Sequence, residues 1–194
     1  AFSPNGEQLA AGFGWGDRDL EIIEWSSESP AFSLSLDGTV SKIVYSADGG
    51  VLAAMLHTCG VCPPRKDTGL RAWKSEGNQL FYEKSGFGME DMALSPDGSL
   101  LAYVRENGKE IQVVNLATGE ELPSLAKHQN TIKQIAFSHN GKTLASGDLD
   151  GILILWNTKD WNARLTVPGH DAILALSFSN NDSRLALGGK GSVE

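Results

Sequence analysis

The fold is decided by residues 137–145, which read Phe137-Ser138-His139-Asn140-Gly141-Lys142-Thr143-Leu144-Ala145. The pattern is an aromatic residue, Ser, any residue, Asx and Gly, followed by Leu-Ala. With drift at single positions it occurs five times, beginning at residues 2, 45, 94, 137 and 178. The steps between copies are 43, 49, 43 and 41 residues. A repeat that runs through the whole chain must be interpreted before any single motif.

Each copy has the composition of a tight turn between two β-strands. Asx and Gly tolerate the positive φ that such a turn requires, and the flanking runs are apolar. After the Leu-Ala strand comes a third run, which ends in residues such as Trp73 or Trp156, and then a shorter fourth run such as 165–167. Four short strands in about 43 residues are the unit of a β-propeller blade. The sequence therefore predicts an all-β chain.

The repeats resemble the WD40 family over essentially the whole chain. The fourth copy is the best preserved and reads Lys127-His128, then 132–138, Leu144-Ala145-Ser146-Gly147, Asp150 and Leu153-Ile154-Leu155-Trp156-Asn157. The resemblance implies a hydrogen-bonded tetrad of His128, Ser146, Asp150 and Trp156 with a structural, non-catalytic role. Buried carboxylate, imidazole and indole groups each need a partner. Replacing Asp150 with Ala is therefore expected to destabilise the chain by about 1–3 kcal/mol.

The resemblance also predicts how the chain is organised, as a single propeller segment over residues 1–194. We expect blades at 1–36, 37–84, 85–126 and 127–168, and a partial blade at 169–194, which makes about four and a half four-stranded blades. Propellers close with roughly four to eight blades, because an open ring leaves apolar blade faces uncovered. We therefore expect a part of a larger ring that is completed by the remaining blades of a longer chain. The alternative is a small ring completed by another chain.

Composition excludes several classes of protein. Of the 194 residues, 41% are hydrophobic and 21% are charged, as in ordinary globular proteins. The 16 Lys and Arg against 24 Asp and Glu give a net charge of −8, which repels phosphate backbones and argues against a nucleic-acid partner. Apolar runs such as Ile152–Trp156 are far too short to cross a membrane. No signal peptide is visible, so we expect a cytoplasmic protein.

Two insertions are the candidate binding regions. The connection between the second and third strands is short in blade four, but Phe13–Arg18 extend it in blade one and Leu56–Lys66 extend it in blade two. Long loops on a rigid scaffold are where binding residues concentrate. We expect a protein or peptide partner to contact residues of hot-spot type in these loops, namely Trp15, Asp17, Arg18, Arg65 and Lys66. The alternative is that both insertions are tolerated surface loops.

Blade two also carries the two cysteines of the chain, Cys59 and Cys62. Two Cys separated by two residues supply half of a zinc site, and His57 is a candidate third ligand. No second Cys pair exists, so two reduced thiols in a loop are the alternative, and we expect no bound metal and no cofactor. Two cysteines also exclude a disulfide scaffold.

Together these observations favour a non-enzymatic scaffold or sensor module that binds a protein or peptide through the loop-rich face of a propeller. The alternative is a propeller-type hydrolase or lactonase with a site at the channel mouth. Such an enzyme would need His and carboxylate groups that converge at the channel, whereas the sequence offers a scattered set. Most of the tempting Asp residues occupy the turn position of the repeat, where the family resemblance gives them a structural role.

Overall fold

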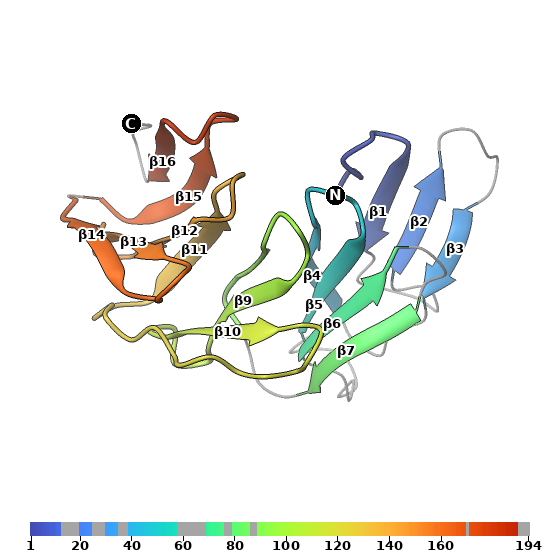
Figure 1. Cartoon of the computed structure of the whole chain (residues 1–194), viewed down its shortest axis with the longest axis horizontal. Coiled ribbons are helices and arrows are strands. Elements are labelled where there is room, and N and C mark those ends of the chain that lie inside the picture. Colours follow the sequence, from blue (N-terminus) through green and yellow to red (C-terminus); the bar gives the residue numbers. More distant parts are fainter. Residues whose placement is uncertain are drawn as a thin grey trace. The chain divides into compact units, whose positions relative to one another are not determined.

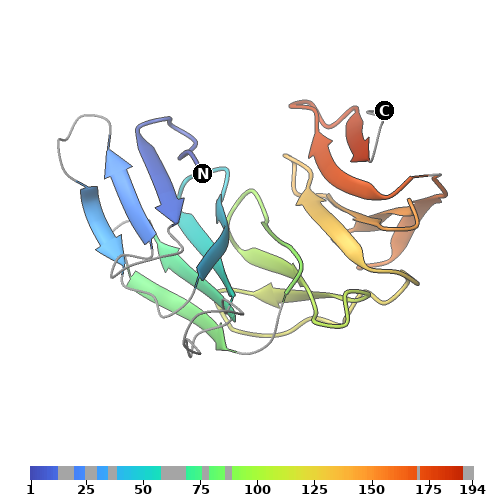
Figure 2. The ribbon, with the colours of Figure 1, turned by 180° about the vertical axis from the view of Figure 1, so that it is seen from behind.

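The computed structural model of the chain describes residues 1–12, 20–24, 30–34, 39–57, 69–75, 79–85, 89–169 and 171–189. These residues form strands and turns and no helix, so the all-β prediction is confirmed. The chain divides into two compact units, Ala1–Gly88 and Met89–Glu194. Each unit is a series of antiparallel sheets in which strands pair in chain order (Figures 1 and 2).

The first unit contains two sheets. One sheet consists of β1 (Gln8–Gly12), β2 (Leu20–Glu24) and β3 (Pro30–Leu34). The other has four strands, which are β4 (Thr39–Tyr45), β5 (Val51–His57), β6 (Gly69–Lys74) and β7 (Gln79–Ser85). A single bridge between Phe2 and Leu9 continues the first sheet on the edge of β1 that does not pair with β2. That bridge lies where the repeat predicts the end of a further strand.

The second unit contains three sheets. The first has β8 (Met92–Leu94), β9 (Leu100–Val104) and β10 (Ile111–Asn115). The second has four strands, which are β11 (Ile132–Phe137), β12 (Thr143–Asp148), β13 (Leu153–Asn157) and β14 (Ala163–Val167). The third pairs β15 (Ile173–Phe178) with β16 (Leu185–Gly189). Each sheet falls within one sequence repeat, and antiparallel sheets in series are what a WD40-type propeller requires.

The third repeat differs from a four-stranded blade. Beyond β10 the chain makes only two isolated bridges, Ile111 to Leu125 and Val114 to Glu121. Pro123 lies in this segment and has no N–H to give to a ladder. The buried Gln112 side chain takes over part of the pairing, because its amide donates to the backbone carbonyl of Leu122. Backbone hydrogen bonds such as Leu122 N to Val113 O remain, so a side chain supplements an interrupted fourth strand.

Neighbouring sheets pack through the same pair of positions in two repeats. A Cβ at Gly147 would lie 2.4 Å from Cγ2 of Ile173 in the next sheet. A Cβ at Gly12 would lie 2.6 Å from Val40, also in the next sheet. Gly12 and Gly147 occupy equivalent places after the Leu-Ala pair, and each faces a β-branched residue at the start of the following sheet. The seam therefore needs a missing side chain on one sheet and a compact apolar side chain on the other.

The largest hydrophobic core of the second unit joins its first two sheets. It contains eleven buried residues, among them Val113, Ile135, Leu144 and Trp156, and Trp161 packs against it. Trp156 is 2% exposed, so its indole ring is enclosed within the sheet packing. Burial of an aromatic ring of this size is a major stabilising contribution, and it also requires that the indole N–H find an acceptor.

Candidate functional site

Three of the four predicted tetrad residues meet in the β11–β14 sheet. The indole Nε1 of Trp156, on β13, donates to Oγ of Ser146, on β12, over 2.8 Å. Nε2 of His128, in the connection before β11, lies 2.7 Å from the same Oγ. Ser146 is 0% exposed and His128 is 5% exposed, so these bonds form out of contact with water. The structure therefore brings His128, Ser146 and Trp156 together as one buried group.

The fourth member is Asp148, and the prediction of Asp150 was wrong. Oδ2 of Asp148 lies 2.6 Å from Nδ1 of His128, and both side chains are buried. Side chains two residues apart on a strand lie on the same face. Ser146 and Asp148 both belong to β12, whereas Asp150 lies beyond its end and is exposed. The carboxylate that reaches the imidazole is therefore the one on the face of Ser146.

The donors and acceptors of this network run in one direction. Trp156 Nε1 can only donate, and an ionised carboxylate such as that of Asp148 can only accept. We assign the proton of a neutral His128 ring to Nδ1, which donates to Asp148, so that Nε2 accepts the Ser146 hydroxyl proton. Every polar side-chain atom in the chain of bonds has a partner, as burial demands.

Asp148 also organises the turn that follows β12. Its second oxygen, Oδ1, accepts the backbone N–H of Asp150 at 3.0 Å and that of Ile152 at 2.9 Å. Asp150 itself accepts a hydrogen bond from Nδ2 of Asn130 at 2.7 Å, close to the surface. One buried carboxylate therefore holds both the connection that carries His128 and the tight turn 148–151.

These segments belong to a set of connections that touch one another. Ile132 N donates to Gly108 O at 2.7 Å, and Leu149 N donates to Thr131 O at 3.0 Å. A Cβ at Gly151 would lie 2.5 Å from the carbonyl oxygen of Asp171. We call the surface formed by residues 105–110, 127–131, 148–151, 168–169 and 171–172 the loop face. Its backbone is anchored from beneath by Asp148, while Leu149 and Asp150 are exposed on it.

The order of bonds in the network is that of a Ser-His-Asp catalytic triad. A carboxylate orients an imidazole, and the imidazole accepts the proton of a serine hydroxyl. Catalysis also requires that a substrate carbonyl reach the hydroxyl oxygen. Ser146 Oγ instead receives the indole N–H of Trp156 in the core, with no exposed surface on Ser146. The geometry is that of a triad, but its surroundings are those of a structural anchor.

The remaining predicted site residues fall in two groups. Trp15, Asp17, Arg18, Cys59, Cys62, Arg65 and Lys66 lie outside the described residues. His57 is described and ends β5, and its Nε2 is buried without a hydrogen-bond partner in the described part of the chain. Within the described ranges, no three His, Cys, Asp or Glu residues lie close enough together to hold a metal ion. The expectation that Cys59, Cys62 and His57 bind no metal ion therefore stays a prediction.

Sequence reasoning missed the role of the serine in the repeated turn. In all five corners its Oγ donates to the Asx side chain two residues on, over 2.5–3.0 Å. The same Oγ accepts the backbone N–H five residues on, over 2.9–3.0 Å. In the third corner, the hydrogen bond from Ser95 is the main cause of a lowered pKa for Asp97. Recurrence of Ser at a fixed place before Asx was the available signal.

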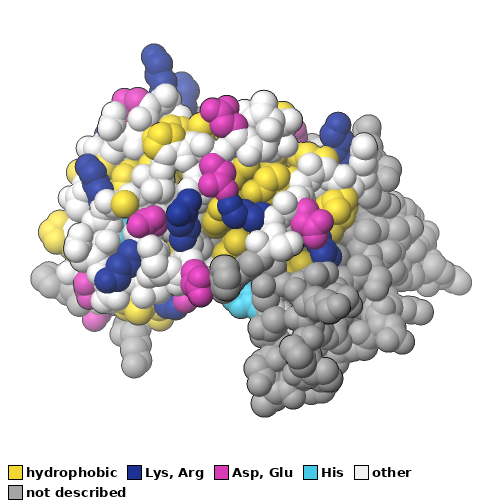
Figure 3. Space-filling model, turned by 90° about the horizontal axis from the view of Figure 1, so that it is seen from below, with side chains coloured by type: hydrophobic (Ala, Val, Ile, Leu, Met, Phe, Trp, Pro, Cys, Tyr) yellow, Lys and Arg dark blue, Asp and Glu magenta, His cyan; other side chains and the backbone are white. Residues whose placement is uncertain are grey.

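The exposed charges do not form a patch of one sign in the view of Figure 3. Lys and Arg side chains alternate with Asp and Glu over the described part of that face, with hydrophobic side chains between them. Several of the charges pair, such as Lys133 with Glu90 at 2.5 Å and Arg71 with Glu83 at 2.9 Å. A nucleic-acid groove is usually lined by unbroken positive charge. No helix in the described ranges is long and apolar enough to pass through a membrane.

The chain is similar to known repeat proteins. The sequence profile of the family described as "WD domain, G-beta repeat" matches residues 119–157. Transducin beta-like protein 3 of Rattus norvegicus is 26% identical over 98% of this chain and 23% of its own length. Intraflagellar transport protein 122 homolog of Mus musculus is 28% identical over 59% of this chain, and a component of chromatin assembly factor 1 of Gallus gallus is 27% identical over 71%. The chain matches only 9% and 16% of the lengths of these last two proteins.

Proposed function

We propose that the chain is part of a non-enzymatic scaffold that binds a protein or peptide through its loop face, on the ground that residues 119–157 match the WD40 repeat model. The remaining blades of a longer chain would complete the ring. The proposal includes a cytoplasmic location and no nucleic-acid or membrane partner, in line with the net charge of −8. Two relatives are named for intraflagellar transport and for chromatin assembly. Microscopy of the tagged full-length protein therefore tests the proposed cytoplasmic location.

The proposal rests on one observation. The hydrogen-bonded polar side chains of the second unit are buried, whereas the turn at residues 148–151 is held by hydrogen bonds at the surface. Ser146, His128 and Asp148 are enclosed, and the turn that Asp148 supports presents Leu149 and Asp150 to solvent. Leu149 is 38% exposed, although it is a large apolar residue next to a polar turn. A rigid backbone that displays an apolar residue beside charged ones loses little entropy when a partner binds.

We expect loop-face variants to lose a bound protein partner while variants on the opposite end of the strands keep it. Leu149→Ser and Asp150→Lys alter exposed side chains of the loop face, and Trp15→Ala tests the equivalent connection between β1 and β2. Loss of one hot-spot contact lowers affinity by about tenfold or more. The measurement is quantitative cross-linking and affinity capture of the full-length protein from its own cells, with binding constants then measured for the purified partner.

The matched control is Lys142→Glu, which changes an exposed charge in the turn between β11 and β12, away from the loop face. Binding should be unchanged in this variant. Equal loss of the partner in Lys142→Glu and in the loop-face variants would mean that the loop face has no special role. Undiminished binding in Leu149→Ser, Asp150→Lys and Trp15→Ala would place the partner elsewhere and refute the proposal.

A further inference from the structure

Within each of the two units, the corners of successive sheets meet at the same pair of positions. We number each corner from the residue before its Ser, so that the third residue of one corner faces the fifth residue of the next. A Cβ at Gly49 would lie 3.5 Å from Cδ of Pro4, and a Cβ at Gly141 would lie 3.5 Å from Cδ of Pro96. At these two junctions a proline ring therefore packs beside a glycine at van der Waals distance.

The junction between the fourth and fifth corners replaces this pair with polar residues. His139 stands in the place of the proline, and Asp182 stands in the place of the glycine. Asp182 adopts φ of 56°, a left-handed conformation that side chains disfavour and that the other four corners give to glycine. Two departures from the repeat thus occur together, at residues that face each other.

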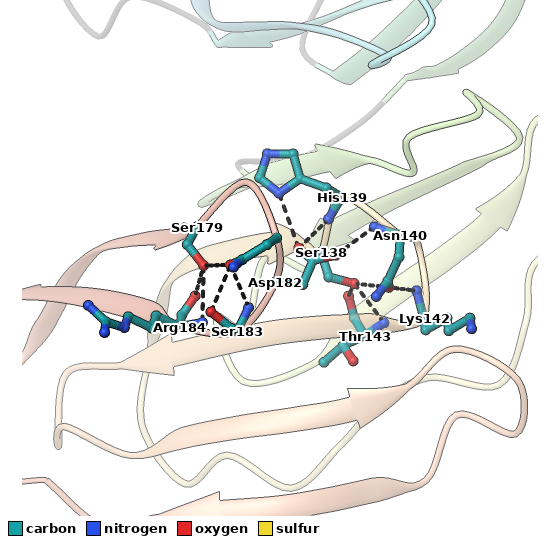
Figure 4. A network of polar contacts seen from close by, with 10 residues as sticks. Ser138, His139, Asn140, Lys142, Thr143, Ser179, Asp182, Ser183 and Arg184 are labelled. Carbon is teal, nitrogen blue, oxygen red and sulfur yellow. Dashed lines mark hydrogen bonds and ion pairs between the residues drawn. The ribbon is translucent and has the colours of Figure 1, made fainter.

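Asp182 bonds directly to the neighbouring corner (Figure 4). Its Oδ1 accepts the backbone N–H of His139 at 2.8 Å and lies 3.1 Å from Nδ1 of the same residue. Its Oδ2 accepts the backbone N–H of Asn140, also at 2.8 Å. The carboxylate is 12% exposed, although the imidazole beside it is 50% exposed. Hydrogen bonds to an ionised carboxylate are stronger than those between neutral groups.

The charges around the carboxylate favour its ionised form. Removal from water opposes ionisation, but the N–H groups of His139 and Asn140, together with the His139 imidazole, outweigh it and lower the pKa of Asp182. The other charged side chains of the two corners, Lys142 and Arg184, project to opposite sides of the network in Figure 4. The bonded form of Asp182 is therefore the form present at neutral pH.

We propose that Asp182 and His139 form a polar clamp that holds the corner of the β15–β16 sheet against the corner of the β11–β12 hairpin, in place of the Pro–Gly contact of the Pro4–Gly49 and Pro96–Gly141 junctions. The same two sheets also pack through apolar residues, because Ile173 lies in one buried cluster with Ala145 and Leu153. The clamp adds one polar contact to this apolar seam, at the corners of the two sheets, independently of any partner on the loop face.

A double-mutant cycle tests the clamp, with native-state amide hydrogen exchange followed by NMR. Asp182→Gly removes both acceptor oxygens, and His139→Pro removes one N–H and the imidazole. We expect the Asn140 amide to exchange about tenfold faster in Asp182→Gly, as expected for loss of one charge-assisted hydrogen bond. The β15–β16 amides should also exchange faster in each single variant. The double variant restores the Pro–Gly pair, so its β15–β16 amides should recover protection.

Two further variants keep the cycle interpretable. Asp182→Asn keeps a residue that tolerates left-handed φ but loses one acceptor, so its amides should exchange at intermediate rates. Lys142→Ala should leave the β15–β16 exchange rates unchanged.

Because the folded-state pKa of Asp182 is lowered, the clamp is complete above the usual aspartate range and is lost as the pH falls through the lowered value. The amide shifts of His139 and Asn140 should follow that titration. Additive effects in the cycle, or amide shifts that do not titrate, would overturn the clamp.

Discussion

Replacing Asp148 with Ala is expected to lower the free energy of unfolding of the second unit by about 2–4 kcal/mol. The substitution removes the partner of His128 Nδ1 and leaves that ring nitrogen buried without an acceptor. It also removes the acceptor for the N–H groups of Asp150 and Ile152, which loosens the tight turn. Urea denaturation followed by circular dichroism measures the change.

Asp150→Ala is the matched control, because it removes the same side chain two residues away. The Asp150 carboxylate is exposed and accepts only the surface hydrogen bond from Asn130 among its described side-chain contacts. Its loss should change stability by no more than about 0.5 kcal/mol. Asp148→Asn keeps an oxygen for the turn but presents an amide to His128, so its effect should fall between the two. A larger loss of stability in Asp150→Ala than in Asp148→Ala would mean that Asp150 is the fourth member of the tetrad.

The second large effect is expected from Gly151→Ala, which should cost about 3 kcal/mol or more. Gly151 has φ of 78°, and a Cβ there would lie 2.5 Å from Asp171 O and 3.1 Å from Gly169 C. Both neighbours are backbone atoms of the next connection, which cannot move aside as a flexible side chain would. The methyl group would therefore push apart two segments of the loop face.

Gly119→Ala separates this steric effect from the backbone preference. Gly119 has a similar φ of 71°, but no atom lies within 4 Å of where its Cβ would stand. Its substitution should cost only the conformational term, about 1–2 kcal/mol. The two variants are compared by urea denaturation under identical conditions. Equal losses would mean that the connections are not packed as closely as we describe.

The sequence was sufficient to predict the elements that depend on the repeat. The spacing of the corners predicted antiparallel sheets in series, because Asx-Gly turns between apolar runs have few other solutions. His128, Ser146 and Trp156 followed from the resemblance, and the structure joins them by hydrogen bonds. At each of these three positions of the fourth repeat, the sequence offers one residue of the required type. There was therefore no second candidate to choose between.

The carboxylate was mistaken because two aspartates stand close together after Ser146. The resemblance favours Asp150, whereas strand alternation favours Asp148, and only the point at which β12 ends decides between them. The sequence also did not predict that the fourth strand of the third repeat is reduced to two isolated bridges. The hydrogen bond from the Gln112 amide to the Leu122 carbonyl depends on how far that side chain reaches across the sheet. The spacing of the repeats gives no information on that reach. The junction of His139 with Asp182 required knowledge of which corners face each other.

Ser146, His128 and Asp148 form a buried structural anchor beneath the exposed loop face. The most direct test is to treat the native chain with a fluorophosphonate, which bonds covalently to accessible, activated serine hydroxyls, and to map adducts by mass spectrometry beside a known serine hydrolase. With Ser146 fully buried and bonded to Trp156, we predict no adduct at Ser146. Stoichiometric labelling of Ser146 that disappears in His128→Ala would contradict the account and identify a catalytic serine.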